Sequence, residues 1–263
     1  PPIAVAGWRF LIGLIVIGLW AVSRGTSLSL PRSRWLPLLV FGLIFVVQIG
    51  ATNIGTQKTS ANYAVILLNT FPIFVAILAH LFLPGDRLSL RKIAGLLLAF
   101  LGVTFVFLET PNVQGMMVGN LLCLLSGFLL AVIQVYGKFL LRSLTAIQIV
   151  FWEIAIGVPF FFLLSRIYEP SERNVSFAVA LSILYQGAVV AGFCFVSWMQ
   201  LLKSYPASKL TALSFSIPVF GVVLSWVILG EPITLRLILG VAGVAAGIFL
   251  VSGARSADPL GEH

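Results

Sequence analysis

Two stretches that lie far apart in the chain share one pattern, and this internal repeat limits the possible folds more than any other feature. Residues 59–102 and 205–247 share an alanine near the start, at positions 61 and 207, and each carries a proline inside a long apolar run. Pro72 aligns with Pro218 at a shift of 146 positions, and the glycines that follow align at a shift of 145. One inserted residue, which we assign to Pro84, accounts for the difference. Repeats built from hydrophobic spans are typical of membrane transporters, so the chain is predicted to be a duplicated membrane protein.

The composition excludes a soluble globule. Hydrophobic residues make up 60% of the 263 positions and charged residues only 9%, with a mean hydropathy of +1.10. Too little polar surface remains to keep such a chain in water, so lipids are its expected surroundings. The net charge of +8 does not indicate a nucleic-acid partner, because the basic residues stand singly or in pairs between apolar segments.

Nine apolar runs are long enough to cross a hydrocarbon core of about 30 Å as helices. They cover approximately residues 3–23, 35–54, 61–83, 92–108, 118–137, 146–165, 177–201, 207–229 and 235–252. Charged and turn-forming residues separate them, so no interval could hold a soluble domain. The predicted fold class is an all-α polytopic membrane protein.

The distribution of Lys and Arg predicts the orientation of the spans. Alternate loops carry eleven basic residues in one set and four in the other, with Arg9 set aside because it lies within the first span. Basic loops stay in the cytoplasm, so Pro1 is expected outside and the C-terminus inside. A chain that starts outside with Pro1-Pro2 also indicates a missing first helix, and hence ten spans in all.

Ten spans give five per repeat, and an odd number requires the second repeat to be inverted relative to the first. A weaker match supports this division, since Trp8-Arg9 aligns with Trp152-Glu153 at a shift of 144. The predicted domains are a first repeat at 1–110, lacking its first helix, a second repeat at 111–252, and a cytoplasmic tail at 253–263.

These features resemble the drug/metabolite transporter superfamily, specifically its EamA-type permeases. The resemblance covers nearly the whole chain and rests on Pro1-Pro2 with Trp8-Arg9-Phe10, on 59–72 with Gly85-Asp86, and on 206–218 with Gly230-Glu231-Pro232. It implies ten helices in two inverted five-helix repeats, both termini in the cytoplasm and a central substrate cavity. Members move small organic solutes such as amino acids, metabolites and drugs, usually without ATP.

Two charged residues within spans are the first candidates for function. Glu153 lies about 10 Å deep at 1.5 Å per residue, where a carboxylate is costly unless it faces a cavity or takes up a proton. It is a candidate for proton coupling, and a protonated packing residue is the alternative. Arg9 needs an anion, carbonyl groups or water. It is a candidate for binding a substrate carboxylate, although its place in a family-typical Arg-Phe pair favours a structural role.

Further candidates for the lining of a cavity are polar or aromatic residues within the spans. Asn62 and Asn69 share one face of a span in which Pro72 removes a backbone hydrogen bond, and Pro218 does the same in the matching span. Hydrogen bonding between helices explains such residues equally well. The remaining candidates are Gln48, Gln134, Trp152, Gln186, Thr211 and Phe215.

Catalytic and cofactor motifs are absent from the sequence. It contains no Walker motif, nucleophile elbow or cluster of metal ligands, so we expect no enzyme, no metal and no cofactor. Glycines at matching positions of the two repeats predict close helix packing, in a core-supporting or homodimer surface. The leading interpretation is an alternating-access exporter of the bacterial inner membrane. An intramembrane or lipid-modifying enzyme, and a channel or scaffold, are the alternatives.

Overall fold

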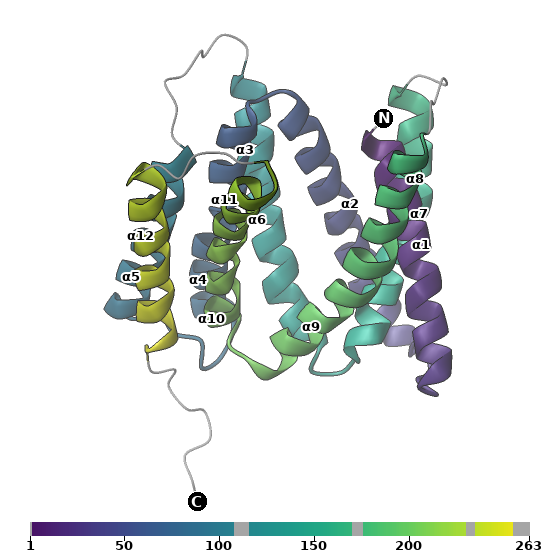
Figure 1. Cartoon of the computed structure of the whole chain (residues 1–263). Coiled ribbons are helices and arrows are strands. Elements are labelled where there is room, and N and C mark those ends of the chain that lie inside the picture. The colour runs from purple at the N-terminus through teal and green to yellow at the C-terminus, as the bar shows by residue number, and fades with distance from the viewer. Residues whose placement is uncertain (1, 108–115, 170–175, 230–234, 255–263) are drawn as a thin grey trace, which may run out of the picture. The chain divides into compact units, whose positions relative to one another are not determined.

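A computed structural model of the chain describes residues 2–107, 116–169, 176–229 and 235–254, and every regular element in these ranges is helical. Figure 1 shows the helices in chain order. They are α1 (Pro2–Ser23), α2 (Trp35–Gln57), α3 (Ala61–Leu68), α4 (Phe71–Phe82), α5 (Leu90–Phe107), α6 (Met117–Leu140), α7 (Ala146–Tyr168), α8 (Phe177–Tyr185), α9 (Phe195–Ser204), α10 (Ala207–Ala212), α11 (Ser216–Leu229) and α12 (Leu235–Ser252). Short 3₁₀ turns form η1 (Arg32–Arg34) and η3 (Leu213–Phe215), and η2 (Gln186–Cys194) is a π-helix.

The predicted fold class is confirmed: the protein is an all-α polytopic membrane protein. Eight helical segments of the described ranges are long and apolar enough to cross a membrane. The predicted span 207–229 is helical as well, but it is divided into α10, η3 and α11. A tenth helix stays a prediction. Residues 108–115, 170–175 and 230–234, which fall mostly between predicted spans, and tail residues 255–263 lie outside the described residues.

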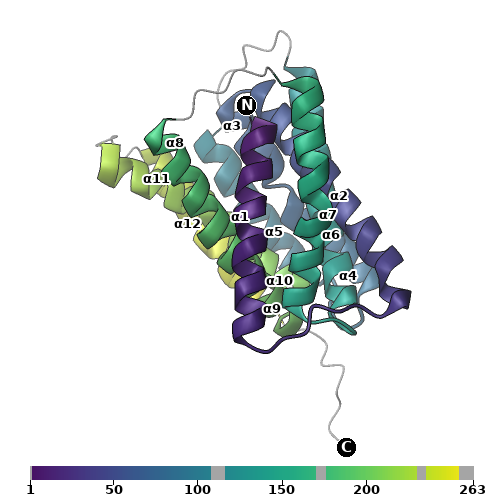
Figure 2. The ribbon, with the colours of Figure 1, turned by 90° about the vertical axis from the view of Figure 1, so that its right-hand side faces the viewer.

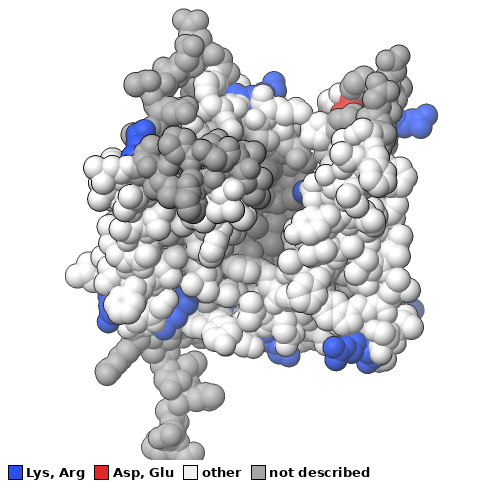
Figure 3. Space-filling model, in the orientation of Figure 1, with Lys and Arg blue, Asp and Glu red and all other residues white. Residues whose placement is uncertain are grey.

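The outward-facing side chains of the helices are suited to a lipid environment. Large apolar residues are strongly exposed, among them Val22 at 79%, Leu90 at 83% and Phe177 at 85%. Blue and red atoms in Figure 3 cover little of the face drawn and lie mostly near its upper and lower margins. Apolar exposure on this scale is favourable when the surroundings are lipid chains.

The chain forms two compact units, and each unit combines two separate stretches of sequence. Unit 1 comprises residues 1–53 and 136–204, and unit 2 comprises residues 54–135 and 205–263. Two of the three limits between the units fall within α2 and α6, and the third follows α9. Each unit therefore takes helices from both halves of the sequence, and the repeat boundaries near residue 110 stay a prediction.

Unit 1 is built around α1, which packs against α7 and η2 (Figure 2). Phe10 on α1 is 1% exposed. Its ring lies 4.9 Å from that of Phe45, 5.4 Å from that of Phe161 and 6.1 Å from that of Phe195. Aromatic rings from four helices therefore meet at one point, which orients α1 within the unit.

In unit 2, α5 and α12 lie side by side through facing glycines (Figure 1). A Cβ atom on Gly95 would lie 2.7 Å from the carbonyl oxygen of Gly247, and one on Gly102 would lie 2.7 Å from that of Gly240. Backbones this close exclude any side chain at these positions. The predicted close packing thus occurs within the chain, where it supports the core of unit 2, and a homodimer stays a prediction.

Candidate functional site

The polar candidates of unit 2 lie on two interrupted helices, α3–α4 and α10–η3–α11. The first helix stops at Asn69, whose Nδ2 donates to the Val65 carbonyl at 2.8 Å. Next to it, Thr70 Oγ1 donates to the Leu67 carbonyl at 2.6 Å. The same two carbonyls also accept the backbone amides of Asn69 at 3.0 Å and Thr70 at 3.2 Å. The side-chain hydrogen bonds are therefore added to backbone ones, and the polar groups of both side chains are satisfied within the helix, as an apolar environment requires.

Each repeat-related proline lies just after an interruption. Pro72 is in the first turn of α4, where its missing N–H costs no helical hydrogen bond. Pro218 is in the first turn of α11, after the 3₁₀ turn Leu213–Phe215. The helices are therefore interrupted before the prolines rather than at them. Because α4 packs against α10, the structure brings the two interrupted helices together in unit 2.

The other candidates on these helices differ in exposure. Asn62 is half-buried in the first turn of α3. Thr211 and Phe215 are both 0% exposed. Thr211 Oγ1 donates to the Ala207 carbonyl at 2.8 Å, and Phe215 belongs to the apolar core that includes Leu96. Both side chains therefore contribute to the interior of unit 2.

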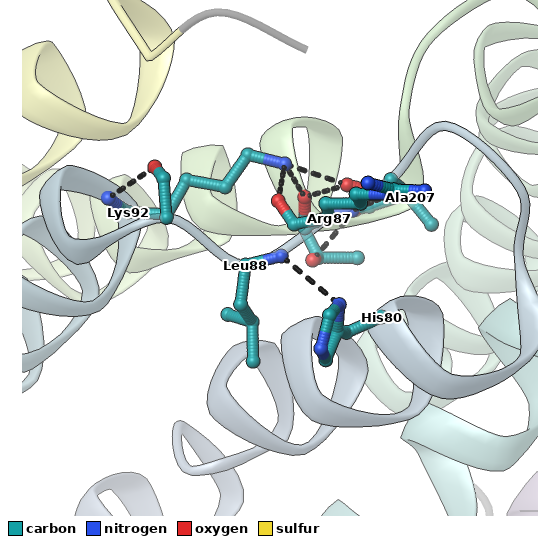
Figure 4. Close-up of polar contacts among 9 residues, drawn as sticks. His80, Arg87, Leu88, Lys92 and Ala207 are labelled. Carbon is teal, nitrogen blue, oxygen red and sulfur yellow. Dashed lines mark hydrogen bonds and ion pairs between the residues drawn. The ribbon is translucent and has the colours of Figure 1, made fainter. Parts of the chain in front are cut away.

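A buried ionic network joins the turn after α4 to the start of α10, as Figure 4 shows. Lys92 Nζ donates to Asp86 Oδ1 at 2.8 Å, to the Arg87 carbonyl at 2.9 Å and to Ser208 Oγ at 3.1 Å. Asp86 also accepts hydrogen bonds from the Ser208 amide at 2.9 Å and from its hydroxyl group. In the same turn, the Leu88 amide donates to His80 Nδ1 at 3.3 Å. All three ammonium hydrogens of Lys92 thus have an acceptor.

The network is nearly closed to solvent, since Lys92 is 0% and Asp86 4% exposed. Burial raises the pKa of the Asp86 carboxyl group, but hydrogen bonds from Lys92 and Ser208 outweigh burial and leave this pKa below its ordinary value. This network was not predicted from the sequence, where the basic residues between spans were read only as determinants of orientation. The signal was weak: Lys92 lies next to an arginine at the start of a span.

In unit 1, Glu153 lies on α7 and is 3% exposed. Its neighbours along the helix, Val150 and Ile154, are also buried. Among the described residues, no hydrogen bond or ion pair reaches the Glu153 carboxyl group. A carboxyl group so placed is far less costly as the neutral acid than as the anion, so its environment favours proton uptake.

Arg9 lies on α1, where it contacts the start of the π-helix. Its Nη1 donates to Gln186 Oε1 at 3.3 Å, and its Cζ lies 4.6 Å above the centre of the Phe10 ring. The Arg9 Nε atom is buried and has no hydrogen-bond partner within the described structure. Two sequence candidates, Arg9 and Gln186, are thus brought together from positions 177 residues apart.

Trp152 helps to hold the connection between α1 and α2. Its indole Nε1 donates to the Leu28 carbonyl at 2.9 Å, and its ring meets that of Trp35 edge-on at 4.6 Å. One turn earlier, Gln148 Nε2 donates to the carbonyls of Ser27 and Ser29. The indole N–H of Trp152 is therefore already paired with protein.

The remaining candidates, Gln48 on α2 and Gln134 on α6, belong to units 1 and 2 respectively. They are 6% and 8% exposed. Gln48 Nε2 donates to Thr52 Oγ1 at 3.1 Å.

Both cysteines are free, Cys123 buried and Cys194 exposed. No group of three or more His, Cys, Asp or Glu side chains within the described ranges could hold a metal ion.

A second contact missed by the sequence analysis fixes the start of α1. The Glu169 carboxylate at the end of α7 accepts hydrogen bonds from the amides of Ile3 at 2.7 Å and Ala4 at 2.9 Å. A carboxylate at a helix N-terminus satisfies free amide groups and interacts favourably with the helix dipole. Glu169 therefore has a structural role.

Comparison with known proteins agrees with this architecture. The chain is 27% identical to "Uncharacterized transporter YoaV" of Bacillus subtilis (strain 168), over 95% of this chain and 87% of the relative. It is 26% identical to "Probable amino-acid metabolite efflux pump" of Escherichia coli (strain K12), over 95% of this chain and 85% of that protein. A solved crystal structure that is 20% identical has the same fold, with a TM-score of 0.86 over 96% of this chain and 89% of that one.

The family assignment rests on both halves of the sequence. The model of the EamA-like transporter family matches residues 1–108 and again residues 117–253. With the resemblance in its motifs confirmed over nearly its whole length, the chain belongs to the EamA-like transporter family of the drug/metabolite transporter type.

Proposed function

We propose that the protein is a secondary-active transporter that exports small organic solutes, such as amino acids, other metabolites or drugs, across the bacterial inner membrane by alternating access. Family membership supports a transport role. The name of the Escherichia coli relative, which refers to amino-acid metabolite efflux, supports this class of solute and this direction.

The observation that carries the proposal is the pair of helix interruptions related by the internal repeat. One lies at Asn69–Thr70 and the other at Leu213–Phe215, and each is followed by a proline in the first turn of the next helix. Interrupted helices at membrane depth are tolerated where their backbone is buried in protein or lines a cavity, and transporters use them at substrate and ion sites. Two such points in corresponding positions of the two repeats therefore favour a carrier.

Glu153 is the group that we assign to proton coupling. The carboxyl group is buried and without a partner among the described residues, so loss of its proton inside the protein is costly. A conformation that admits water to Glu153 lowers this cost and releases the proton on that side of the membrane. A conformational change that moves Glu153 between such environments couples proton movement to solute movement.

The basic loops give the orientation within this proposal. Eleven Lys and Arg residues lie in one set of loops and four in the other. By the positive-inside rule, the C-terminus and the turn that contains Asp86 are then cytoplasmic, and Pro1 is outside. Cysteine accessibility in right-side-out vesicles tests this orientation: a cysteine in place of Arg87 should be protected from a membrane-impermeant maleimide.

Counterflow in proteoliposomes tests the carrier itself. Liposomes that contain the protein are preloaded with an unlabelled solute, and a trace of the same labelled solute is added outside. A panel of amino acids and their derivatives is suitable. A carrier should accumulate label transiently in the preloaded liposomes, because exchange is faster than net flux. A channel gives no such overshoot, and absence of counterflow across the panel would count against a carrier of these solutes.

The proton-coupling role has a separate test. Glu153→Gln keeps the size of the side chain but cannot ionise, so solute uptake into vesicles should no longer depend on an imposed pH gradient. The matched control is Glu169→Gln, which makes the same change at the C-cap of the same helix, at a group that holds the start of α1. An unchanged gradient dependence in Glu153→Gln would contradict the assignment.

A further inference from the structure

No carboxylate among the described residues forms an ion pair with Arg9. Asp86 is paired with Lys92, and Glu169 accepts the amides of Ile3 and Ala4. The third described acid, Glu153, forms no ion pair. Arg9 therefore carries a positive charge within a membrane-spanning helix and has no counter-ion in the described structure.

The hydrogen bonds of the Arg9 guanidinium group are also incomplete. Of its five N–H donors, one reaches Gln186 Oε1, at the long distance of 3.3 Å, and the buried Nε has no partner among the described residues. An unsatisfied charged donor in an apolar region is costly, so such arginines usually mark a ligand or an ion pathway. Arg9 is only half-buried, which leaves part of the guanidinium group accessible to a ligand.

The surroundings hold Arg9 and Gln186 in place. The buried ring of Phe10 lies beneath the guanidinium group. On the facing helix, a Cβ atom on Gly187 would lie 2.7 Å from the Arg9 carbonyl oxygen, so the two backbones are in direct contact. Gln186 begins the π-helix η2, and π-helical turns inside helices are often found at functional sites.

We propose that Arg9 and Gln186 bind the carboxylate group of the transported solute. Because Gln186 Oε1 accepts a hydrogen bond from Arg9, its Nε2 remains as a donor, and no acceptor for it occurs in the described structure. Guanidinium and amide N–H groups together match the two oxygens of a carboxylate, which guanidinium binds in a bidentate manner. The solutes are thus amino acids or other small organic acids, an inference that rests on the proposed function.

Paired solutes that differ only in charge test this site. The full chain in detergent is titrated with L-phenylalanine, L-leucine and benzoate, and with the amide of each, and thermal stabilisation gives the dissociation constants. At least one acid should bind about tenfold or more tightly than its amide, since charge-assisted hydrogen bonds are stronger than neutral ones. In Arg9→Gln this preference should vanish, while Arg9→Lys should keep part of it.

Two further variants separate binding from folding. Arg166→Gln removes an exposed arginine on α7 and should keep the preference of the unmodified protein. Gln186→Leu retains Arg9. It should weaken the binding of the acids, but not of the amides, by about threefold to tenfold, as loss of one hydrogen bond predicts. This variant serves if Arg9→Gln does not fold.

The outcomes distinguish the site from the carrier. The carboxylate site would be overturned by any of three results. These are equal binding of acids and amides, no binding of any acid at millimolar concentration, and a preference for acids that is undiminished in Arg9→Gln. Counterflow of amides alone would support the carrier proposal and contradict the carboxylate site. Arg9-dependent binding of acids without counterflow of any solute would support the site and contradict the carrier.

Discussion

Replacing Lys92 by methionine should be among the most destabilising changes at a single charged position of unit 2. The substitution keeps most of the apolar stem but removes the ammonium group. It breaks hydrogen bonds to Asp86, to the Arg87 carbonyl and to Ser208. Asp86, 4% exposed, would then be a buried carboxylate without a counter-ion.

The size of the effect follows from this geometry. Removing one partner of a buried ion pair costs about 3–5 kcal/mol. Asp86 keeps the amide and hydroxyl donors of Ser208, so we expect the lower end of the range, about 3 kcal/mol. In the double variant Lys92→Met/Asp86→Asn no charge is left unpaired. Its cost should be smaller than the sum of the single changes, with a coupling energy of about 2 kcal/mol.

Reversible unfolding in mixed detergent and SDS micelles measures these free energies. The matched control is Arg91→Met, which changes an exposed neighbour on the same helix and should cost within about 0.5 kcal/mol of zero. If Lys92→Met were no more destabilising than Arg91→Met, or if the coupling energy were near zero, the buried pair would not stabilise the protein as argued.

Three further changes test other contacts. Since the folded pKa of Asp86 is lowered, its stabilising effect is complete above the ordinary Asp pKa of about 4 and is lost as pH falls through the lower folded value; Asp86→Asn should lack this acid dependence in the same unfolding assay. Gly247→Leu should destabilise the α5–α12 pair, because its Cβ would lie 2.5 Å from backbone atoms of α5, whereas Gly221→Leu, with nothing within 4 Å, should be tolerated. If both leucine variants melted at the same temperature, close packing of α5 and α12 would be refuted. Glu169→Ala leaves two amides of α1 without acceptors and should cost about 1–3 kcal/mol, with faster hydrogen exchange at the start of α1; unchanged exchange there would contradict the capping role.

Features that depend on local hydropathy could be predicted from the sequence. The spans 3–23 and 146–165 lie within α1 and α7, because a long apolar run in lipid must satisfy its own backbone as a helix. The prolines predicted irregular helices, yet the interruption before Pro72 begins at Asn69, where side-chain hydrogen bonds add to backbone ones. Hydropathy does not predict the position of these side-chain hydrogen bonds.

The sequence by itself determined a duplicated all-α membrane protein, because the repeat and the apolar spans are properties of the chain that no packing arrangement alters. Only the tertiary structure decided which polar groups are partners. Lys92 meets Ser208 across 116 positions, and Arg9 meets Gln186 across 177. These pairings depend on the rotation of each helix about its axis, which side-chain packing sets and which an almost uniformly apolar span leaves undefined. For the same reason, the buried pair of Asp86 and Lys92 looked like two ordinary loop charges in the sequence.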